Sequence, residues 1–476
     1  MAGTATLTST LPSRLDALPW SRWHTRIVAA LGITWMLDGL EVTVVGSLGP
    51  MLQSSEALGL SATEIGWAGS AYIGGAVLGA LFFGKLSDRH GRKPLFLWTL
   101  SVYLFATLCT AFSFNFATFA ACRAVTGFGI GGEYAAINSA IDELIPARVR
   151  GLVDLAINGS FWVGAAAGAA LSIVLLEPGR FAPDVGWRIA FAFGATLAIA
   201  ILLVRRHVPE SPRWLLSHGH KHEGEAIVEE IEREVLGEQG AEAEAHVPIE
   251  MLPRPPVTWT EIARLMLSHY RHRAVLGFTL MATQAFFYNA IFFTYALVLT
   301  TFYDVSAADV GYYIFAFAVG NFLGPLLLGR FFDSVGRRRM IAATYGFSGV
   351  GLLLTGVAFT QGWLDATTQT LCWSVIFFAA SAAASSAYLT VSEVFPLEMR
   401  AVAISIFYAI GTGVGGFVGP ALYGTLIDMG SRGALFIGYA GAAGLMCVAA
   451  IVALLIGVDA ERQPLESVAR PLSSVR

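Results

Sequence analysis

The sequence predicts an all-α membrane protein: twelve transmembrane helices in two pseudo-symmetric six-helix bundles, with both termini in the cytoplasm. Three observations lead to this prediction: an apolar composition, the number of long apolar segments, and an internal repeat. Of the 476 residues, 55% are hydrophobic and only 13% are charged, and the mean hydropathy is +0.63. Soluble domains carry about 25% charged residues. The composition therefore excludes an ordinary soluble protein, and the net charge of -4 gives no reason to expect a nucleic-acid partner.

The predicted spans are apolar segments long enough to cross a bilayer. A helix of about 20 mostly apolar residues satisfies its own backbone hydrogen bonds where no water is available. The sequence contains twelve such segments, at residues 27–52, 63–86, 95–114, 117–140, 152–176, 187–205, 273–301, 308–331, 340–360, 367–391, 401–427 and 433–457.

Orientation follows from the loops between these segments. Lysine and arginine collect in alternate loops, for example at Lys85 and Arg89 and again at Arg339, while the other loops carry acids such as Glu56 and Asp365. Basic loops resist translocation and stay in the cytoplasm. We therefore expect both termini to be cytoplasmic in a multi-pass protein of the cell (plasma or inner) membrane.

One long hydrophilic stretch divides the hydrophobic pattern at its midpoint. Within it, Ser211 followed by Pro212 is typical of a helix start, so we expect short cytoplasmic helices there rather than a flexible linker. The predicted organisation is a cytoplasmic segment at 1–26, a six-helix bundle at 27–205, the linker at 206–271, a second bundle at 272–457 and a cytoplasmic tail at 458–476.

An internal repeat relates the two halves. Residues 84–93 (GKLSDRHGRK) recur as residues 329–338 (GRFFDSVGRR), a displacement of 245 positions (329 minus 84). Each copy follows the second span of its half. A second set, displaced by 250 positions, follows the fourth span of each half and pairs Glu143, Pro146 and Arg150 with Glu393, Pro396 and Arg400.

These motifs resemble those of a known family. The G-[KR]-x-x-D-x-x-G-R-[RK] pattern in both halves, with residues 123–133 (RAVTGFGIGGE), is similar to the major facilitator superfamily over essentially the whole chain. Residues 209–215 (PESPRWL) resemble its sugar-porter and metabolite:proton symporter branch. The resemblance implies the major facilitator fold and a secondary transporter that works by alternating access, and not an enzyme.

The repeated motifs supply the candidate gating residues. Asp88 and Asp333 can lie near helix ends or arginines and brace a closed gate at the cytoplasmic face, while the glycines allow tight turns and close helix approach. The candidate gating residues are Gly84, Asp88, Arg89, Gly91, Arg92, Glu143, Arg150, Asp333, Gly336, Arg337, Glu393 and Arg400.

The first span carries a pair of acids. Residues 35–41 (WMLDGLE) resemble an element of the aromatic-acid and related organic-acid:proton symporters. Asp38 and Glu41 are three residues apart and share one helix face. A charged carboxylate at that depth is costly unless it is paired, hydrated or protonated, which is the behaviour a proton carrier needs. We expect one of the two acids to take the proton and Arg123 to switch between it and the substrate; a static buried ion pair is the alternative.

The remaining candidates are amide and aromatic residues that can line a central cavity. The predicted substrate-binding residues are Asn158, Trp162, Gln284, Phe287, Tyr288, Asn289, Tyr388 and Tyr408.

The favoured function is proton-coupled uptake of a small metabolite such as an organic or aromatic acid. The alternatives are a sugar or polyol:proton symporter, a drug or metabolite:proton antiporter, and a transport-dead membrane sensor. The expected partners are the small-molecule substrate, protons and the lipid bilayer, for a chain acting as a monomer. No cofactor or metal is expected, because no metal cluster, nucleophile motif or phosphate-binding loop occurs.

Overall fold

The computed structural model describes residues 7–53, 55–175, 181–205, 208–237, 248–251, 257–292, 294–306 and 309–474. Within these residues, each of the twelve predicted segments corresponds to one long helix or to two helices in tandem. Several helices extend beyond their predicted segment at one end of the molecule. The helix predicted to end at residue 86, for example, continues to His90, because polar residues there prolong it past the apolar stretch.

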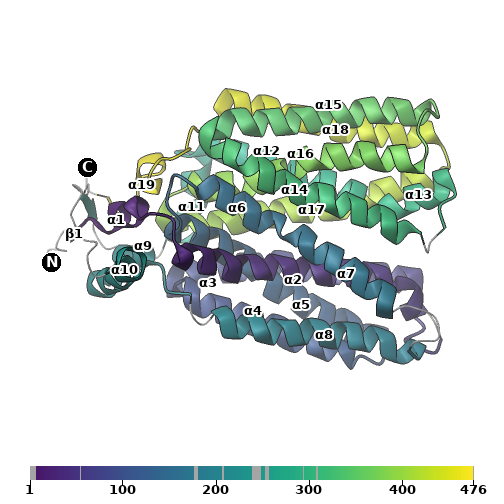
Figure 1. Ribbon diagram of the computed structural model, residues 1–476, viewed down its shortest axis with the longest axis horizontal. Helices are drawn as coiled ribbons and strands as arrows, with labels where there is room; N and C mark the ends of the chain where they lie inside the picture. Colours follow the sequence, from purple (N-terminus) through teal and green to yellow (C-terminus); the bar gives the residue numbers. More distant parts are fainter. Residues whose placement is uncertain are drawn as a thin grey trace.

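The N-terminal half is a bundle of long helices (Figure 1). Its fifth span is divided into two helices in tandem. The helices are α2 (Arg22–Gln53), α3 (Ala62–His90), α4 (Arg92–Ala111), α5 (Phe116–Leu144), α6 (Arg150–Gly159), α7 (Phe161–Leu175) and α8 (Pro183–Arg205).

The C-terminal half repeats this arrangement (Figure 1), and the tandem pair is now in its first span. The helices are α12 (Arg271–Phe292), α13 (Tyr295–Tyr303), α14 (Val310–Ser334), α15 (Arg337–Thr360), α16 (Ala366–Glu393), α17 (Arg400–Asp428) and α18 (Arg432–Ile456), with the short η1 (Leu397–Met399) before α17.

Length and composition support a membrane-spanning role for these helices. Among the described residues, nine of them are long and apolar enough to cross a bilayer; α2, α5 and α8 are the others that match predicted spans. Neighbouring helices approach closely at glycines: a Cβ at Gly349 of α15 would lie 2.8 Å from the carbonyl oxygen of Ala443 in α18. Small residues at such crossings let the backbones of membrane helices pack together.

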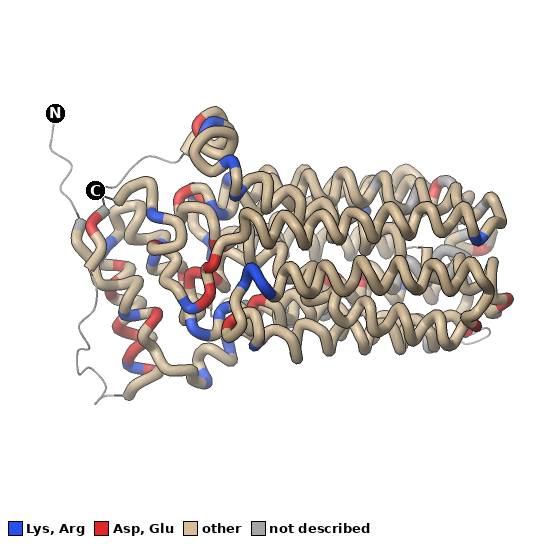
Figure 2. Tube along the Cα trace, turned by 90° about the horizontal axis from the view of Figure 1, so that it is seen from above, with Lys and Arg blue, Asp and Glu red and all other residues tan. Residues whose placement is uncertain are grey.

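The short elements gather at one end of the bundle, at the left of Figure 1. Charged residues are concentrated at that end and around these elements (Figure 2). This end of the bundle is therefore called the charged end. It is the end that the loop charges predict to be cytoplasmic. The elements are β1 (Leu7–Ser9) paired antiparallel with β2 (Ile249–Met251), α1 (Leu11–Ala17), α9 (Pro212–Ser217), α10 (Lys221–Leu236), α11 (Trp259–Leu267) and α19 (Leu465–Val468).

The two halves meet along two helix pairs, α3 with α17 and α6–α7 with α14. Near the charged end, a Cβ at Gly84 would lie 2.7 Å from Ser405 Cβ. Nearer the middle, a Cβ at Gly159 would lie 2.8 Å from the Pro325 ring. The halves are therefore in direct contact from the charged end to the centre of the bundle.

Candidate functional site

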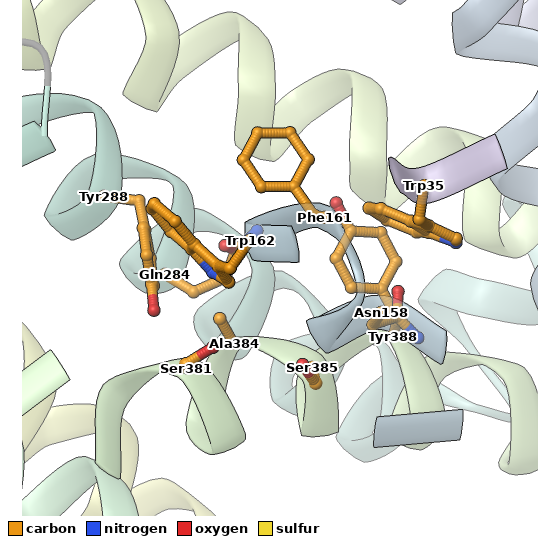
Figure 3. A pocket seen from close by; sticks show the side chains of 10 residues that line it. All are labelled: Trp35, Asn158, Phe161, Trp162, Gln284, Tyr288, Ser381, Ala384, Ser385 and Tyr388. Carbon is orange, nitrogen blue, oxygen red and sulfur yellow. The ribbon is translucent and has the colours of Figure 1, made fainter. Parts of the chain in front are cut away.

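A cavity of about 120 Å³ lies between the two halves near the centre of the bundle. Figure 3 shows aromatic rings along one side and the small side chains of α16 along the other. Helices α2, α6 and α7 supply the residues from the N-terminal half, and α12 and α16 those from the C-terminal half. The lining residues are Trp35, Asn158, Phe161, Trp162, Gln284, Tyr288, Ser381, Ala384, Ser385 and Tyr388.

The break in the fifth span positions two of these residues. Ser160 separates α6 from α7, and its hydroxyl donates to the carbonyl of Gly32 in α2 (2.8 Å). A serine that bonds a neighbouring backbone carbonyl competes with the regular helix pattern. Asn158 and Trp162 flank this break, and both face the cavity.

Five of the eight predicted substrate residues line the cavity and three do not. Asn158, Trp162, Gln284, Tyr288 and Tyr388 are in the lining. The other three are placed elsewhere: the ring of Phe287 stacks on Phe377, the amide of Asn289 donates to the carbonyl of Ala285 in its own helix, and the ring of Tyr408 packs against Tyr134.

One hydrogen-bond donor and one acceptor at the cavity have no partner among the described residues. They are the indole Nε1 of Trp35 and the amide Oδ1 of Asn158. The Asn158 Nδ2, by contrast, donates to Asn138 Oδ1 (3.2 Å). Buried polar atoms are normally paired, so these two atoms are available to a polar group of a bound molecule.

Asp38 lies one turn beyond Trp35 on α2 and is buried. Tyr72 donates to its Oδ1 (2.7 Å), and Tyr134 donates to its Oδ2. The Tyr134 ring also packs against Trp35, with a centroid distance of 4.6 Å. One tyrosine therefore touches both the carboxylate and the wall of the cavity.

Glu41 lies one turn further along α2 and pairs with Arg123 of α5. Both side chains are buried, and the Thr107 hydroxyl lies 3.5 Å from the other carboxylate oxygen of Glu41. The Arg123 guanidinium also lies over the ring of Tyr72, at 4.5 Å. The structure thus gives the two predicted acids different partners: a cation for Glu41 and two tyrosines for Asp38.

A network of buried charges, here called the gate network, occupies the charged end. In the N-terminal half, Arg92 contacts Glu143 (2.8 Å) and Asp88 (3.4 Å). In the C-terminal half, Arg337 contacts Glu393 (2.9 Å) and Asp333 (2.8 Å). Each arginine lies at the start of a helix and spans the ends of two others. The members are Asp88, Arg92, Glu143, Arg150, Asp333, Arg337, Glu393 and Arg400.

The gate network also joins the two halves. Asp333 accepts hydrogen bonds from the backbone N–H groups of Gly151 (3.0 Å) and Leu152 (2.8 Å) at the start of α6. Asp88 accepts one from Val402 (3.1 Å) at the start of α17. Carboxylates at helix N-termini are stabilised by the free N–H groups and the helix dipole. The charged end is therefore closed by reciprocal carboxylate caps.

Two arginines complete the reciprocal contact. Arg150 lies 3.6 Å from Glu393 of the other half, and Arg400 lies 3.6 Å from Glu143. Gly91 and Gly336 have φ of +95° and +113°, which an L side chain rarely adopts. They allow the chain to turn from one long helix into the next. Arg89, the remaining candidate, is exposed and lies outside the buried contacts.

The structure adds a pair of glutamates that the sequence interpretation did not assign. Glu210 accepts from the backbone N–H groups of Arg92 (2.8 Å) and Lys93 (3.1 Å) at the start of α4. Glu461 accepts in the same way from the backbone N–H of Arg337 (3.3 Å) at the start of α15. Burial raises the pKa of Glu210, although these N–H groups oppose the shift. Their displacement of 251 positions (461 minus 210) is close to that of the repeat.

Asp16 of α1 is a further unassigned member of this end. Its carboxylate accepts from the backbone N–H of Ala147 (3.1 Å) and contacts Arg213 (2.8 Å) and Arg150 (3.4 Å). Arg213 also contacts Glu466 near the C-terminus (3.0 Å). Burial alone would lower the pKa of Arg213, but Glu466 and Asp16 raise it above its ordinary value.

A family model described as "Sugar (and other) transporter" matches residues 27–471. The chain belongs to this family of membrane transporters. It is a multi-pass transporter of the major facilitator superfamily, of sugar-porter type, and not an enzyme, which confirms the resemblance found in its motifs.

The relatives of this transporter are named for the transport of different small molecules. The niacin transporter NiaP of Acinetobacter baylyi is 27% identical over 96% of this chain and 99% of its own.

 The 4-hydroxybenzoate transporter PcaK of Pseudomonas aeruginosa is 27% identical over 87% of this chain and 89% of its own. Among solved structures, the proton:xylose symporter XylE superposes with a TM-score of 0.78 at 19% identity, over 93% of this chain and 98% of XylE. That likeness confirms the twelve-helix, two-bundle fold.

Proposed function

We propose that this transporter takes up a small monocyclic organic acid, with an aromatic acid favoured, together with a proton. The observation that carries the proposal is the arrangement of Asp38, Tyr134 and Trp35. A buried carboxylate, the tyrosine that bonds it and a wall of the cavity are in direct contact. Intramembrane carboxylates of this kind are costly to keep and usually mark ion or proton pathways.

The size of the cavity favours a substrate with one ring. An apolar cavity of about 150 Å³ accommodates benzene, whereas drug-sized ligands occupy roughly 300–1,000 Å³. The cavity here has a volume of about 120 Å³. Its size supports a small metabolite and argues against the amphipathic substrates of a drug antiporter.

The chemistry of the lining favours an aromatic acid. Rings of Trp35, Phe161, Trp162 and Tyr288 offer faces and edges to a planar ring. Neutral donors, including the Trp35 indole and the Gln284 amide, can bind a carboxylate. The names of two relatives, which describe niacin and 4-hydroxybenzoate transport, agree with a ring that carries a carboxylate.

The two acids of α2 have separate roles in this proposal. Asp38 exchanges the proton, because it touches Tyr134, whose ring packs against Trp35 in the wall of the cavity. Glu41 holds Arg123, and their pair fixes α2 against α5 and orients Tyr72 toward Asp38 through the guanidinium–ring contact.

Transport by proteoliposomes with an imposed proton gradient tests the coupling. We expect Asp38→Asn to abolish gradient-driven accumulation of the substrate while retaining exchange of labelled for unlabelled substrate without a gradient. Exchange needs substrate binding and alternating access but no net proton movement. Accumulation that persists in Asp38→Asn would contradict the proposal, and Asp184→Asn, a partly exposed acid of α8, is the matched control.

Thermal stabilisation of the purified protein tests the substrate class. Nicotinate, 4-hydroxybenzoate and D-xylose are the probes, and a ligand that binds the folded protein raises its unfolding temperature by an amount that grows with concentration relative to Kd. We expect one or both aromatic acids to stabilise the protein. The polar half of the cavity, with Asn158, Gln284 and two serines of α16, makes a sugar the second candidate, and stabilisation by D-xylose alone would establish it.

A further inference from the structure

Two buried carboxylates between the cavity and the gate network have no role in the function proposed above. Asp142 lies near the end of α5 and Asp154 in the middle of α6, and both have a relative exposure of 0%. None of the four carboxylate oxygens has a hydrogen-bond partner among the described residues. The hydroxyl of Ser392, which lies near Asp142, donates instead to the Leu389 carbonyl (2.9 Å).

Helix periodicity places these acids on a polar path. On α6, Arg150, Asp154 and Asn158 follow one another at intervals of four residues and share one face. Arg150 belongs to the gate network, and Asn158 lines the cavity. Asp154 therefore lies one turn from each of them.

A second stripe runs along α5. Tyr134, Asn138 and Asp142 also follow at intervals of four residues. Asn138 joins the two stripes, because its Oδ1 accepts from Asn158 Nδ2 (3.2 Å). Tyr134 donates to Asp38. A continuous succession of polar side chains thus leads from Asp38 to Asp154 and the charged end.

The two acids break the charge balance of the gate network. Its repeat-related members comprise four arginines (Arg92, Arg150, Arg337 and Arg400) and four acids (Asp88, Glu143, Asp333 and Glu393). The positions equivalent to Asp142 and Asp154 in the other half, 250 residues on, are Ser392 and Ile404. The N-terminal half therefore adds two carboxylates for which the repeat supplies no cation.

The surroundings of the two acids differ. The charges that act on Asp142 are Arg400 of α17, Arg150 of α6 and Glu393 of α16. Those that act on Asp154 are Asp142 of α5, Glu393 of α16, Arg337 of α15 and Asp333 of α14. Because the two acids also act on each other, Asp142 faces two cations and two anions. Asp154 faces three anions and two cations, Arg337 and, one turn away on its own helix, Arg150. An ionised carboxylate without a hydrogen-bond donor is strongly unfavourable in such a place.

We propose that Asp154 is a second proton-binding group, neutral while the charged end is closed, which releases its proton when that end opens to water. The direction in which the proton moves rests on the proton-coupled transport proposed above. The binding of a proton by Asp154 does not depend on that proposal. Protonation stabilises the closed state, because the neutral carboxyl can stay buried. Deprotonation favours opening, because the ionised carboxylate gains water as its hydrogen-bond donor.

Alkylation of a buried cysteine measures this opening without substrate or proton gradient. Ser405 has a relative exposure of 0% and lies against Gly84 where α3 meets α17. In a Ser405→Cys protein, N-ethylmaleimide reaches position 405 only when the charged end opens. Following the peptide by mass spectrometry separates it from the four native cysteines. Each rate is divided by that of a free cysteine peptide at the same pH, because N-ethylmaleimide reacts with the thiolate, whose fraction itself rises with pH. We expect this normalised rate to rise with pH, by at most about tenfold per pH unit because one proton is linked to opening.

Substitutions in this background identify the group. Asp154→Asn keeps the volume of a neutral carboxyl, and we expect a slow alkylation whose normalised rate no longer changes with pH. Asp154→Ile, the residue type of the equivalent position in the other half, should behave in the same way. Asp142→Asn removes an anion that favours the proton on Asp154, so the rise with pH should persist and move to lower pH. Asp333→Asn should raise the rate at every pH while the dependence on pH remains.

The outcomes separate this proposal from the previous one. A pH-dependent rate that survives in both Asp154 variants would overturn the assignment, whatever Asp38 does. A rate that is flat only in the Asp154 variants supports it even if Asp38→Asn still accumulates substrate. Circular dichroism and thermal unfolding of each variant show that it is folded before its rate is compared.

Discussion

Asp38 and Glu41 show how strongly the environment separates two similar side chains. They lie one turn apart, yet Asp38 receives hydrogen bonds from Tyr72 and Tyr134 while Glu41 is paired with Arg123. Hydrogen bonds from neutral donors can be kept by either protonation state of a carboxyl, because the hydroxyl groups can turn. An ion pair is lost when the acid is protonated. The tyrosine-bonded acid is therefore better suited to exchanging a proton.

Tyr134→Phe tests that reasoning at the level of one hydroxyl group. The substitution removes a donor to Asp38 and leaves the ring against Trp35. A hydrogen bond to a charged group contributes about 1.5–3 kcal/mol, so we expect proton-driven uptake to fall at least about tenfold while the substrate affinity stays within about twofold. Tyr423→Phe, a buried tyrosine of α17 whose hydroxyl has no hydrogen-bond partner among the described residues, is the control. An equal loss of affinity in Tyr134→Phe would instead mean that Tyr134 contacts the substrate.

Residue periodicity explains which cavity residues could be predicted from the sequence. Gln284 and Tyr288 are one helical turn apart on α12 and both line the cavity. Asn289 is offset from that face, so its exclusion follows from the same geometry. Phe287, three residues after Gln284, is instead directed away by its stacking on Phe377. The small residues Ser381 and Ser385 of α16 were not predicted, because in a membrane helix they resemble ordinary packing positions. Glu461 was missed because its surroundings do not repeat the motif around Glu210.

At the scale of the elements, the contact between α3 and α17 depends on one glycine. A Cβ at Gly84 would lie 2.7 Å from Ser405 Cβ and 3.2 Å from the carbonyl oxygen of Ala401. Gly74, on the same helix, has no such atom within 4 Å. The two positions therefore allow the same substitution to be compared with and without a clash between the halves.

We expect Gly84→Val to keep the charged end from closing and to reduce substrate exchange by at least about fivefold, since overpacking costs about 1–3 kcal/mol. Gly74→Val carries the same change in helix propensity and should retain most of the activity. Exchange in proteoliposomes, normalised to the amount of folded protein, measures both. Equal losses in the two variants would point to the helix itself rather than to the contact between halves.

The arrangement of helices was predictable because it depends on long apolar segments and on a repeat of whole motifs. The ends of the helices were less predictable than their arrangement. Helix α2 begins at Arg22 rather than at residue 27, and the fifth span is broken at Ser160. At the break the Ser160 hydroxyl lies within hydrogen-bond distance of the local carbonyl of Ile157 and of the carbonyl of Gly32, which lies 128 positions away (160 minus 32). No local pattern contains that information.

At the scale of the whole molecule, the closed charged end is nearly but not fully symmetric. Asp333 accepts from two backbone N–H groups of the other half, whereas Asp88 accepts from one. An asparagine offers a single acceptor oxygen. It can replace Asp88 at Val402 but cannot satisfy both Gly151 and Leu152 in place of Asp333.

Asp333→Asn should therefore open the charged end more than Asp88→Asn does. A lost hydrogen bond to a charged group is worth about 1.5–3 kcal/mol, which corresponds to a population change of about tenfold or more. For Asp88→Asn we expect the population of the open state to rise by less than about threefold. Alkylation of the Ser405→Cys protein at one pH gives both values, and equal effects would show that the backbone contacts do not determine the closed state.

The contacts of Asp16 extend this control to a part of the chain outside the bundle. Helix α1 precedes the first span, yet the carboxylate of Asp16 in this helix touches Arg150, Arg213 and the Ala147 backbone. Through Arg213 it is tied to Glu466 near the other terminus. A regulatory protein, a protease or a fused domain that displaced residues 11–17 would thus act on the transport cycle from the aqueous phase, without entering the membrane.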